Sequence, residues 1–218
     1  MKKIKFGFTV AEMITAMSIV GIISAFVIPL SIKSFNKHQA GIVLGSAVEQ
    51  IILGNQNIIQ LVNVNAEDSG SYTDSLVDIT QNDLLKNSNN ANILDTLNEV
   101  VCPFWRLNTE LVTIDSVKDF EGTVIENSEI TADNNTFRYN FAKIPAAIAM
   151  SRSSGDWNIY IDTNGFRSNP NTYGKDIFAF RLQNDGTLRP FDAILDGEEN
   201  GLHFTERVVR EGFRVTYY

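Results

Sequence analysis

Residues 8–37 read FTVAEMITAMSIVGIISAFVIPLSIKSFNK, and this stretch decides how the chain is organised. From Met13 to Ile32 it contains 20 consecutive residues without a charge. As an α-helix, such a run extends about 30 Å, which matches the hydrocarbon core of a bilayer. Lysines flank the run on both sides, at 2, 3 and 5 before it and at 33 and 37 after it. The stretch therefore predicts a membrane-spanning helix near the N-terminus.

Three features separate this segment from an ordinary secretory signal. Such a signal has an apolar region of about 7–15 residues followed by a small-residue cleavage site, whereas the run here is longer and no such site follows it. Glu12 lies within the apolar stretch, where an acidic residue costs up to roughly 3 kcal/mol near a helix centre. Glu12 therefore requires a partner, or else its side chain reaches the headgroups. Pro29 removes a backbone hydrogen bond inside the helix, so a kink or local unwinding is expected there.

The N-terminal pattern also carries a family resemblance. The lysine-rich leader, Gly7, the sequence FTVAE from Phe8 to Glu12 and the apolar run resemble the class III signal of type IV prepilins and type II secretion pseudopilins. The resemblance implies that a membrane-embedded peptidase cuts after Gly7 and methylates the new amine of Phe8. It also implies that Glu12 pairs with the terminal amine of a neighbouring subunit during assembly, and that Pro29 matches a helix-disrupting proline of many pilins.

The expected fold is α+β: a long N-terminal helix packed on a small antiparallel-sheet C-terminal domain. We expect a leader at 1–7, a transmembrane and assembly helix at 8–32, an amphipathic continuation at 33–62 and a globular domain at 63–218. On a helical wheel, several apolar residues of the continuation fall within an arc of about 100°. Those residues are Ala40, Val43, Leu44, Ala47, Ile51, Ile58, Leu61 and Val62. The polar residues Glu49, Gln50, Gln56, Asn57 and Gln60 lie opposite them, and the glycines at 41, 45 and 54 make the pattern less regular.

Local patterns predict the elements of the domain. Strands are expected at 111–114, 123–125, 136–141, 157–161 and 177–182, with turns at 162–165 and 184–186 and a return strand from 187. Short helices are expected at 80–86 and 206–211. In the second of these, Thr205 is the expected cap and Gly212 the stop, and a final strand is expected at 213–218.

A candidate metal site lies between two of these strands. Asp162, Asn164 and Asp176 offer oxygen ligands. The string D-x-N-G…P-N-x-x-G-x-D-x-F-x-F resembles one in the C-terminal domains of many prepilin-like proteins, and some pseudopilins hold calcium in a C-terminal loop. The spacing departs from an EF-hand, because Gly165 stands at position 4 and Tyr173 at position 12. The alternative is that Asx-turns simply fix the loop.

Composition excludes several classes of function. Cys102 is the single cysteine, so neither an internal disulfide nor a cysteine zinc site is available. Residues 1–40 carry a net charge of +4 and the remainder a net charge of −12, which disfavours nucleic-acid binding. His38 and His203 are the only histidines, and no nucleophile elbow, phosphate loop or HExxH motif occurs. The sequence therefore favours a protein that is not an enzyme and has no required cofactor.

The resemblance implies a filament subunit of a type IV pilus or a type II secretion pseudopilus. Its partners would be copies of itself or related pilin-like subunits, the prepilin peptidase and methyltransferase, an inner-membrane assembly platform and the lipid bilayer. The N-terminus would be cytoplasmic and the domain outside, before assembly into a periplasmic or extracellular filament. Two alternatives remain open: a minor or tip subunit that binds an adhesive target or cargo, and a signal-anchored surface enzyme.

Overall fold

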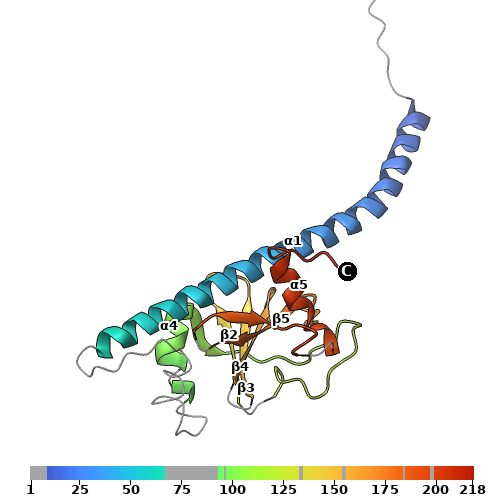
Figure 1. Cartoon of the computed structure of the whole chain (residues 1–218). Coiled ribbons are helices and arrows are strands. Elements are labelled where there is room, and N and C mark those ends of the chain that lie inside the picture. Colours follow the sequence, from blue (N-terminus) through green and yellow to red (C-terminus); the bar gives the residue numbers. More distant parts are fainter. Residues whose placement is uncertain are drawn as a thin grey trace, which may run out of the picture.

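The computed structural model describes residues 9–66, 93–95, 97–132, 135–153, 156–183, 185–196 and 199–218. Its longest element is helix α1, Val10–Ala66. The first half of α1 projects away from the rest of the molecule, and the second half lies across a small sheet domain (Figure 1). The chain is therefore an α+β protein with a long N-terminal helix packed on an antiparallel sheet, which confirms the expected fold class.

The sheet is a six-stranded antiparallel meander in which each strand pairs with the next along the chain. Its strands are β1 Leu107–Leu111, β2 Thr136–Phe141, β3 Ala147–Ser153, β4 Asp156–Asp162, β5 Ile177–Leu182 and β6 Leu188–Pro190. A π-helical turn, η1 Leu97–Val101, and helix α4 Cys102–Trp105 precede it. A 3₁₀ turn, η2 Glu199–Gly201, and helix α5 Phe204–Arg210 follow it.

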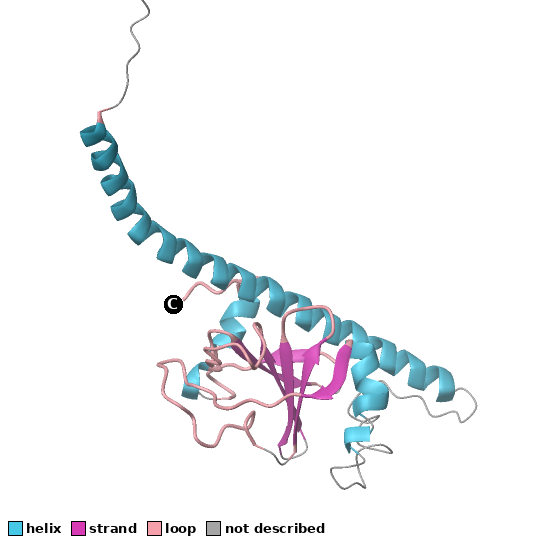
Figure 2. Cartoon of the chain, turned by 180° about the vertical axis from the view of Figure 1, so that it is seen from behind, coloured by secondary structure: helices cyan, strands magenta, loops and turns pink. Residues whose placement is uncertain are grey.

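Side chains alternate between the two faces of the sheet, as strand geometry requires. Ile148, Ile161 and Phe178 stand opposite one another on neighbouring strands and face the main core. The second half of α1 covers that core and crosses one side of the strands (Figure 2). Tyr160 and Ala179 face a smaller core on the other side, which residues of the 112–130 connection also fill.

Two glycines of α1 mark places where the domain approaches the helix backbone. A Cβ on Gly41 would collide with the backbone oxygen of Phe213. A Cβ on Gly54 would lie 2.6 Å from Cδ1 of Trp105. The glycines that make the sequence pattern irregular therefore permit close docking. Their helix-propensity cost of about 1 kcal/mol each is offset by that packing.

A buried polar contact fixes α1 to α4 and to the β5–β6 turn. Asn55 is fully buried, and its Oδ1 accepts a 2.8 Å hydrogen bond from Nε1 of Trp105. Its Nδ2 donates a 2.6 Å bond to the carbonyl of Gly186. Gln50 was expected on the polar side of α1, but it is half-buried and donates to the carbonyl of Trp105. That expectation was wrong because α4 packs on the flank of the helix.

The strand predictions were partly confirmed. The predictions for 136–141 and 177–182 match β2 and β5, and 157–161 lies within β4. The return strand from 187 is β6, which begins at Leu188. The prediction for 111–114 was wrong, because β1 ends at Leu111. The prediction for 123–125 was also wrong, since only an isolated bridge joins Val124 to Lys118. Strand β3 was not predicted, because its sequence AIAMSRS contains a single β-branched residue.

The helix predicted at 206–211 was confirmed as α5, Phe204–Arg210, whereas the predicted cap and the predicted final strand were wrong. Thr205 does not cap α5 from outside, because the helix begins at Phe204 and the Thr205 hydroxyl is buried. That hydroxyl donates to the carbonyl of Leu202 and accepts from the backbone nitrogen of Ala179. Residues 213–218 form no strand, because they pack against α1 and the 174–175 loop through side chains. The predicted helix at 80–86 lies outside the described residues.

Candidate functional site

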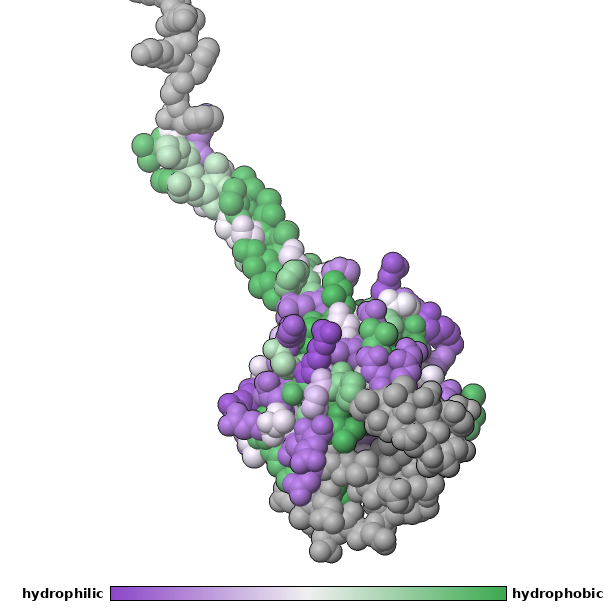
Figure 3. Space-filling view, turned by 90° about the vertical axis from the view of Figure 1, so that its left-hand side faces the viewer, coloured by the Kyte–Doolittle hydropathy of each residue, from purple (hydrophilic) through white to green (hydrophobic). Residues whose placement is uncertain are grey.

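The first half of α1 has no covering element within the part of the chain that the structure describes. Nearly every side chain from Val10 to Asn36 is exposed, whereas burial begins at Gly41. Fourteen large apolar side chains between Val10 and Phe35 are each at least half exposed. Figure 3 shows this half as a hydrophobic rod that ends where hydrophilic side chains of the body begin. A soluble monomer rarely exposes so large an apolar surface. The helix is long and apolar enough to cross a membrane.

The start of α1 carries a reciprocal cap between Thr9 and Glu12. Glu12 Oε2 accepts hydrogen bonds from the Thr9 backbone nitrogen at 2.8 Å and from the Thr9 hydroxyl at 2.9 Å. The backbone nitrogen of Glu12 in turn donates to Thr9 Oγ1 at 3.2 Å. This is the capping-box arrangement, in which two otherwise unpaired backbone donors are satisfied. Sequence reasoning missed it, although the T-x-x-E signature was present.

Hydroxyl groups inside the apolar half are satisfied by their own helix. Thr15 Oγ1 donates to the carbonyl of Ala11 and Ser18 Oγ donates to the carbonyl of Ile14, each at 2.9 Å. Such bonds leave no free hydroxyl donor at Thr15 or Ser18 on the exposed apolar surface. The exposed face is consequently compatible both with lipid and with a second apolar helix.

Pro29 lies inside α1 without ending it, since the helix continues from Val10 to Ala66. The exposed half of the helix curves gradually away from the domain (Figure 1). Gly7 and Phe8, the predicted processing residues, lie outside the described residues. Processing and methylation at these positions stay predictions.

The predicted metal residues come together in the β4–β5 connection. Asp162 Oδ1 accepts 3.0 Å bonds from the backbone nitrogens of Asn164 and Gly165, which is an Asx-turn. The side-chain amide of Asn164 donates to Asp176 Oδ2 at 3.4 Å, and Asp176 Oδ1 accepts from the backbone nitrogen of Thr172. Oδ2 of Asp162 is buried and has no hydrogen-bond partner. These hydrogen bonds directly support the interpretation that an Asx-turn fixes the loop.

Burial gives these two carboxyl groups unusual proton affinities. Burial, and then the charge of Asp176, raises the pKa of Asp162 to about 8. Burial also raises the pKa of Asp176 to about 6. Among the described residues, no group of three or more histidine, cysteine or acidic side chains is placed to hold a metal. Calcium coordination would need backbone or amide oxygens besides the two carboxylates, and it stays a prediction.

Reactive side chains elsewhere are placed for packing. Cys102 is fully buried, and burial raises the pKa of its thiol to about 11, so the thiolate nucleophile is suppressed. The ring centroid of His203 lies 4.2 Å from that of Phe204.

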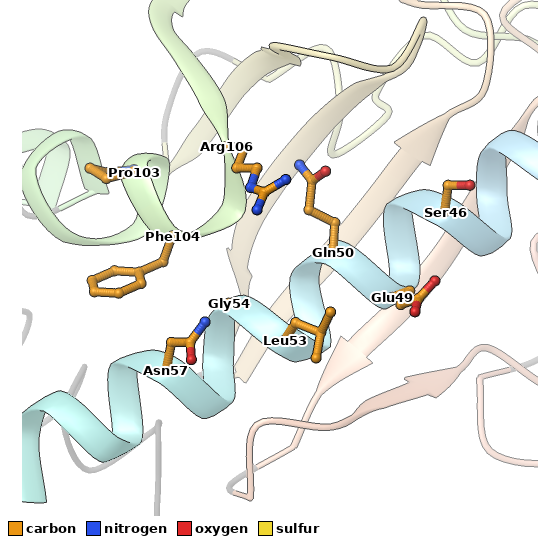
Figure 4. Close-up of a pocket in the computed structure, with 9 residues that line it drawn as sticks. All are labelled: Ser46, Glu49, Gln50, Leu53, Gly54, Asn57, Pro103, Phe104 and Arg106. Carbon is orange, nitrogen blue, oxygen red and sulfur yellow. The ribbon is translucent and has the colours of Figure 1, made fainter.

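A groove of about 490 Å³ runs between α1 and α4 beside Glu49 and Arg106 (Figure 4). Ser46 and Glu49 both line it, but no hydrogen bond joins them in the described part of the chain, whereas covalent catalysis uses a nucleophile hydrogen-bonded to its base.

No protein-family model, no curated protein and no solved structure matches this chain. Its function must therefore be inferred from its own residues. Those residues combine an exposed apolar helix with a docked continuation and an acidic α+β domain.

Proposed function

We propose that this chain is a structural subunit of a type IV pilus-like or type II secretion pseudopilus filament. In this proposal a peptidase cuts after Gly7, and the subunit assembles through residues 8–32. The N-terminus starts in the cytoplasm and the domain outside it, before the subunit enters a periplasmic or extracellular filament. The chain has no catalytic role, and its partners are copies of itself or related subunits, the processing enzyme, an assembly platform and the bilayer.

The observation that carries the proposal is the division of α1 into two halves. Before Asn36 the helix exposes its apolar side chains, whereas from Gly41 onward one face of the helix is buried against the domain. Because α1 is one continuous helix, it joins the domain to an apolar segment for which the described part of the chain supplies no packing partners. A lipid bilayer can supply those partners, and so can the apolar helices of neighbouring subunits.

Glu12 gives the proposed assembly its register. Within the described residues, only its Oε2 oxygen is engaged, by Thr9. An ammonium and a carboxylate attract strongly in a low-dielectric medium, while each is penalised when alone there. In the proposal, the Phe8 amine of a neighbouring subunit donates hydrogen bonds to the Glu12 carboxylate, whose Oε1 oxygen Thr9 leaves available. The Glu12 side chain therefore serves both the cap with Thr9 and the proposed intersubunit ion pair.

Mass spectrometry of the purified membrane protein tests the proposal. The expected mature chain begins at Phe8 and carries one N-terminal methyl group. An uncut Met1, or a start beyond Lys33, would sink the filament proposal and favour the signal-anchored enzyme. Shearing cells and probing the released filaments then separates a major subunit, which dominates that fraction, from a minor or tip subunit that binds a target or cargo.

A further inference from the structure

A cleft of about 750 Å³ lies where the exposed half of α1 meets the domain. One wall is α1 from Pro29 to Ala40, and the other is formed by parts of the 163–176 connection and by Tyr218. The C-terminal segment runs beside α1 at this place (Figure 1). The cleft therefore joins the predicted membrane span to the first turns outside it.

Three lysines gather around one aromatic ring in this cleft. Nζ of Lys37 lies 4.4 Å from the centroid of the Tyr218 ring, and Nζ of Lys33 and of Lys175 each lie 5.8 Å from it. Within the described parts of the chain, no carboxylate forms an ion pair with any of the three ammonium groups. The cleft is thus a concentration of positive charge on a body whose net charge is negative.

The acidic residue in the wall does not neutralise this charge directly. Asp176 is 5% exposed, and its carboxylate oxygens accept hydrogen bonds from Thr172 and Asn164 within its own loop. The ring that gathers the lysines is also fixed in place. The Tyr218 hydroxyl donates a 3.1 Å bond to the carbonyl of Lys175, and the ring packs edge-on to Tyr217. The arrangement is consequently formed before any ligand arrives.

The position of the cleft relative to the span selects its ligand. Lys33 directly follows the uncharged run that ends at Ile32, so it lies at headgroup depth when the helix is inserted. Pro29 and Ile32 give the same cleft an apolar wall. An apolar wall beside a cationic rim matches the two parts of an anionic phospholipid, its glycerol and acyl region and its phosphate. Basic residues near a membrane surface attract such lipids by about 1 kcal/mol each.

We propose that this cleft binds the phosphate of an anionic phospholipid, held by Lys33, Lys37 and Lys175, while Pro29 and Ile32 contact its apolar part. The bound lipid fixes the angle at which the domain stands on the bilayer. The inference rests on the membrane-inserted state of the proposed function and not on filament assembly. It names a ligand class for a site outside the helix-to-helix contacts.

Native mass spectrometry of the full chain in detergent, titrated with phosphatidylglycerol or phosphatidylcholine, tests the proposal. We expect phosphatidylglycerol to bind at least about tenfold more tightly. The triple variant Lys33→Gln, Lys37→Gln and Lys175→Gln should bind the two lipids equally. Equal binding of both lipids by the unchanged protein, or an unchanged preference in the triple variant, would overturn the proposal.

A matched control removes the same charge elsewhere. The variant Arg106→Gln, Lys143→Gln and Arg167→Gln changes three exposed cations outside the cleft and should keep the lipid preference. Loss of preference in this control would show a general charge effect and contradict the site. Circular dichroism of both variants checks that they remain folded.

Two further arms separate other occupants from the lipid. Glycerol phosphate that displaces phosphatidylglycerol at equal concentration would show a soluble-phosphate site and overturn the lipid assignment. A dimer that resists phosphatidylglycerol and disappears in the lysine variant would instead assign the cleft to a second copy. An alkaline wash of cell membranes tests the anchor separately, because release of the unchanged protein contradicts membrane insertion whatever the lipid result.

Discussion

Nε1 of Trp105 donates a 2.8 Å hydrogen bond to Oδ1 of Asn55, and both residues are almost completely buried. Fifty residues separate them in the sequence, so the bond connects α4 to the second half of α1. Asn55 also donates to the carbonyl of Gly186, which places one amide between the helix and the sheet. This contact holds the domain on the long helix.

Replacing Asn55 with leucine should destabilise the domain by about 2–4 kcal/mol, because the Trp105 indole and the Gly186 carbonyl both lose a buried partner. Urea unfolding of the full chain in detergent, followed by tryptophan fluorescence, measures the change. Asn57→Leu is the matched control, since Asn57 is exposed on the same helix and should change the free energy of unfolding by less than about 0.5 kcal/mol. Equal effects at the two positions would contradict the assigned role.

Gly54→Ala should destabilise the protein by about 1–3 kcal/mol, although alanine normally favours a helix. The added methyl group would lie 2.6 Å from Trp105 Cδ1 and 2.9 Å from the carbonyl oxygen of Phe104. Gly21→Ala is the control, because a Cβ there meets nothing within 4 Å. The midpoint of thermal unfolding should fall for Gly54→Ala and should rise or stay unchanged for Gly21→Ala. A stabilised Gly54→Ala protein would show that α1 and α4 are not docked as described.

Asp162 should make stability depend on pH. Its pKa is raised from 3.8 to about 8 in the folded state, so the folded chain keeps a proton that the unfolded chain has released. This contribution is fully present below about pH 4 and is lost as the pH rises toward 8, by at most about 1.4 kcal/mol per pH unit. Asp162→Asn imitates the protonated carboxyl. The free energy of unfolding of this variant, minus that of the unchanged protein, should therefore increase from pH 5 to pH 8. Urea unfolding at each pH measures this difference.

The same variant tests the calcium prediction. Calcium coordination requires ionised carboxylates, so bound calcium would stabilise the unchanged protein most at pH 7–8 and would not stabilise Asp162→Asn. Thermal unfolding with about 1 mM Ca²⁺ and with chelator measures this difference. A midpoint that does not respond to calcium would leave the Asx-turn as the explanation of Asp162, Asn164 and Asp176.

Thr9 and Glu12 variants separate capping from assembly. Thr9→Ala removes the hydroxyl that both donates to Glu12 and accepts from its backbone nitrogen, yet it keeps the carboxylate. Glu12→Ala removes both the cap and the proposed intersubunit pair. We expect both variants to insert in the membrane, and Glu12→Ala to reduce the sheared filament yield at least about tenfold more than Thr9→Ala. Equal yields would reduce Glu12 to a capping residue.

The sequence alone determined the helix, its charge-free run and the division of the chain into a helical and a sheet-containing part. Those features follow from local periodicity and run length, which need no knowledge of distant residues. Strands β2 and β5 were predicted for the same reason, because their apolar and aromatic residues recur at short range. The T-x-x-E cap was also readable locally, although it was not recognised.

Only the tertiary structure decided what Gly41, Gly54 and Asn55 do. In the sequence the two glycines make an apolar stripe less regular and Asn55 carries no signal. In the fold the glycines admit Phe213 and Trp105, and Asn55 satisfies buried polar groups. The same holds for Tyr218, whose ring lies near Lys33 and Lys37 of α1 and Lys175 of the β4–β5 connection. Local pattern cannot reveal such pairs, because close packing and hydrogen bonding depend on which distant surfaces meet.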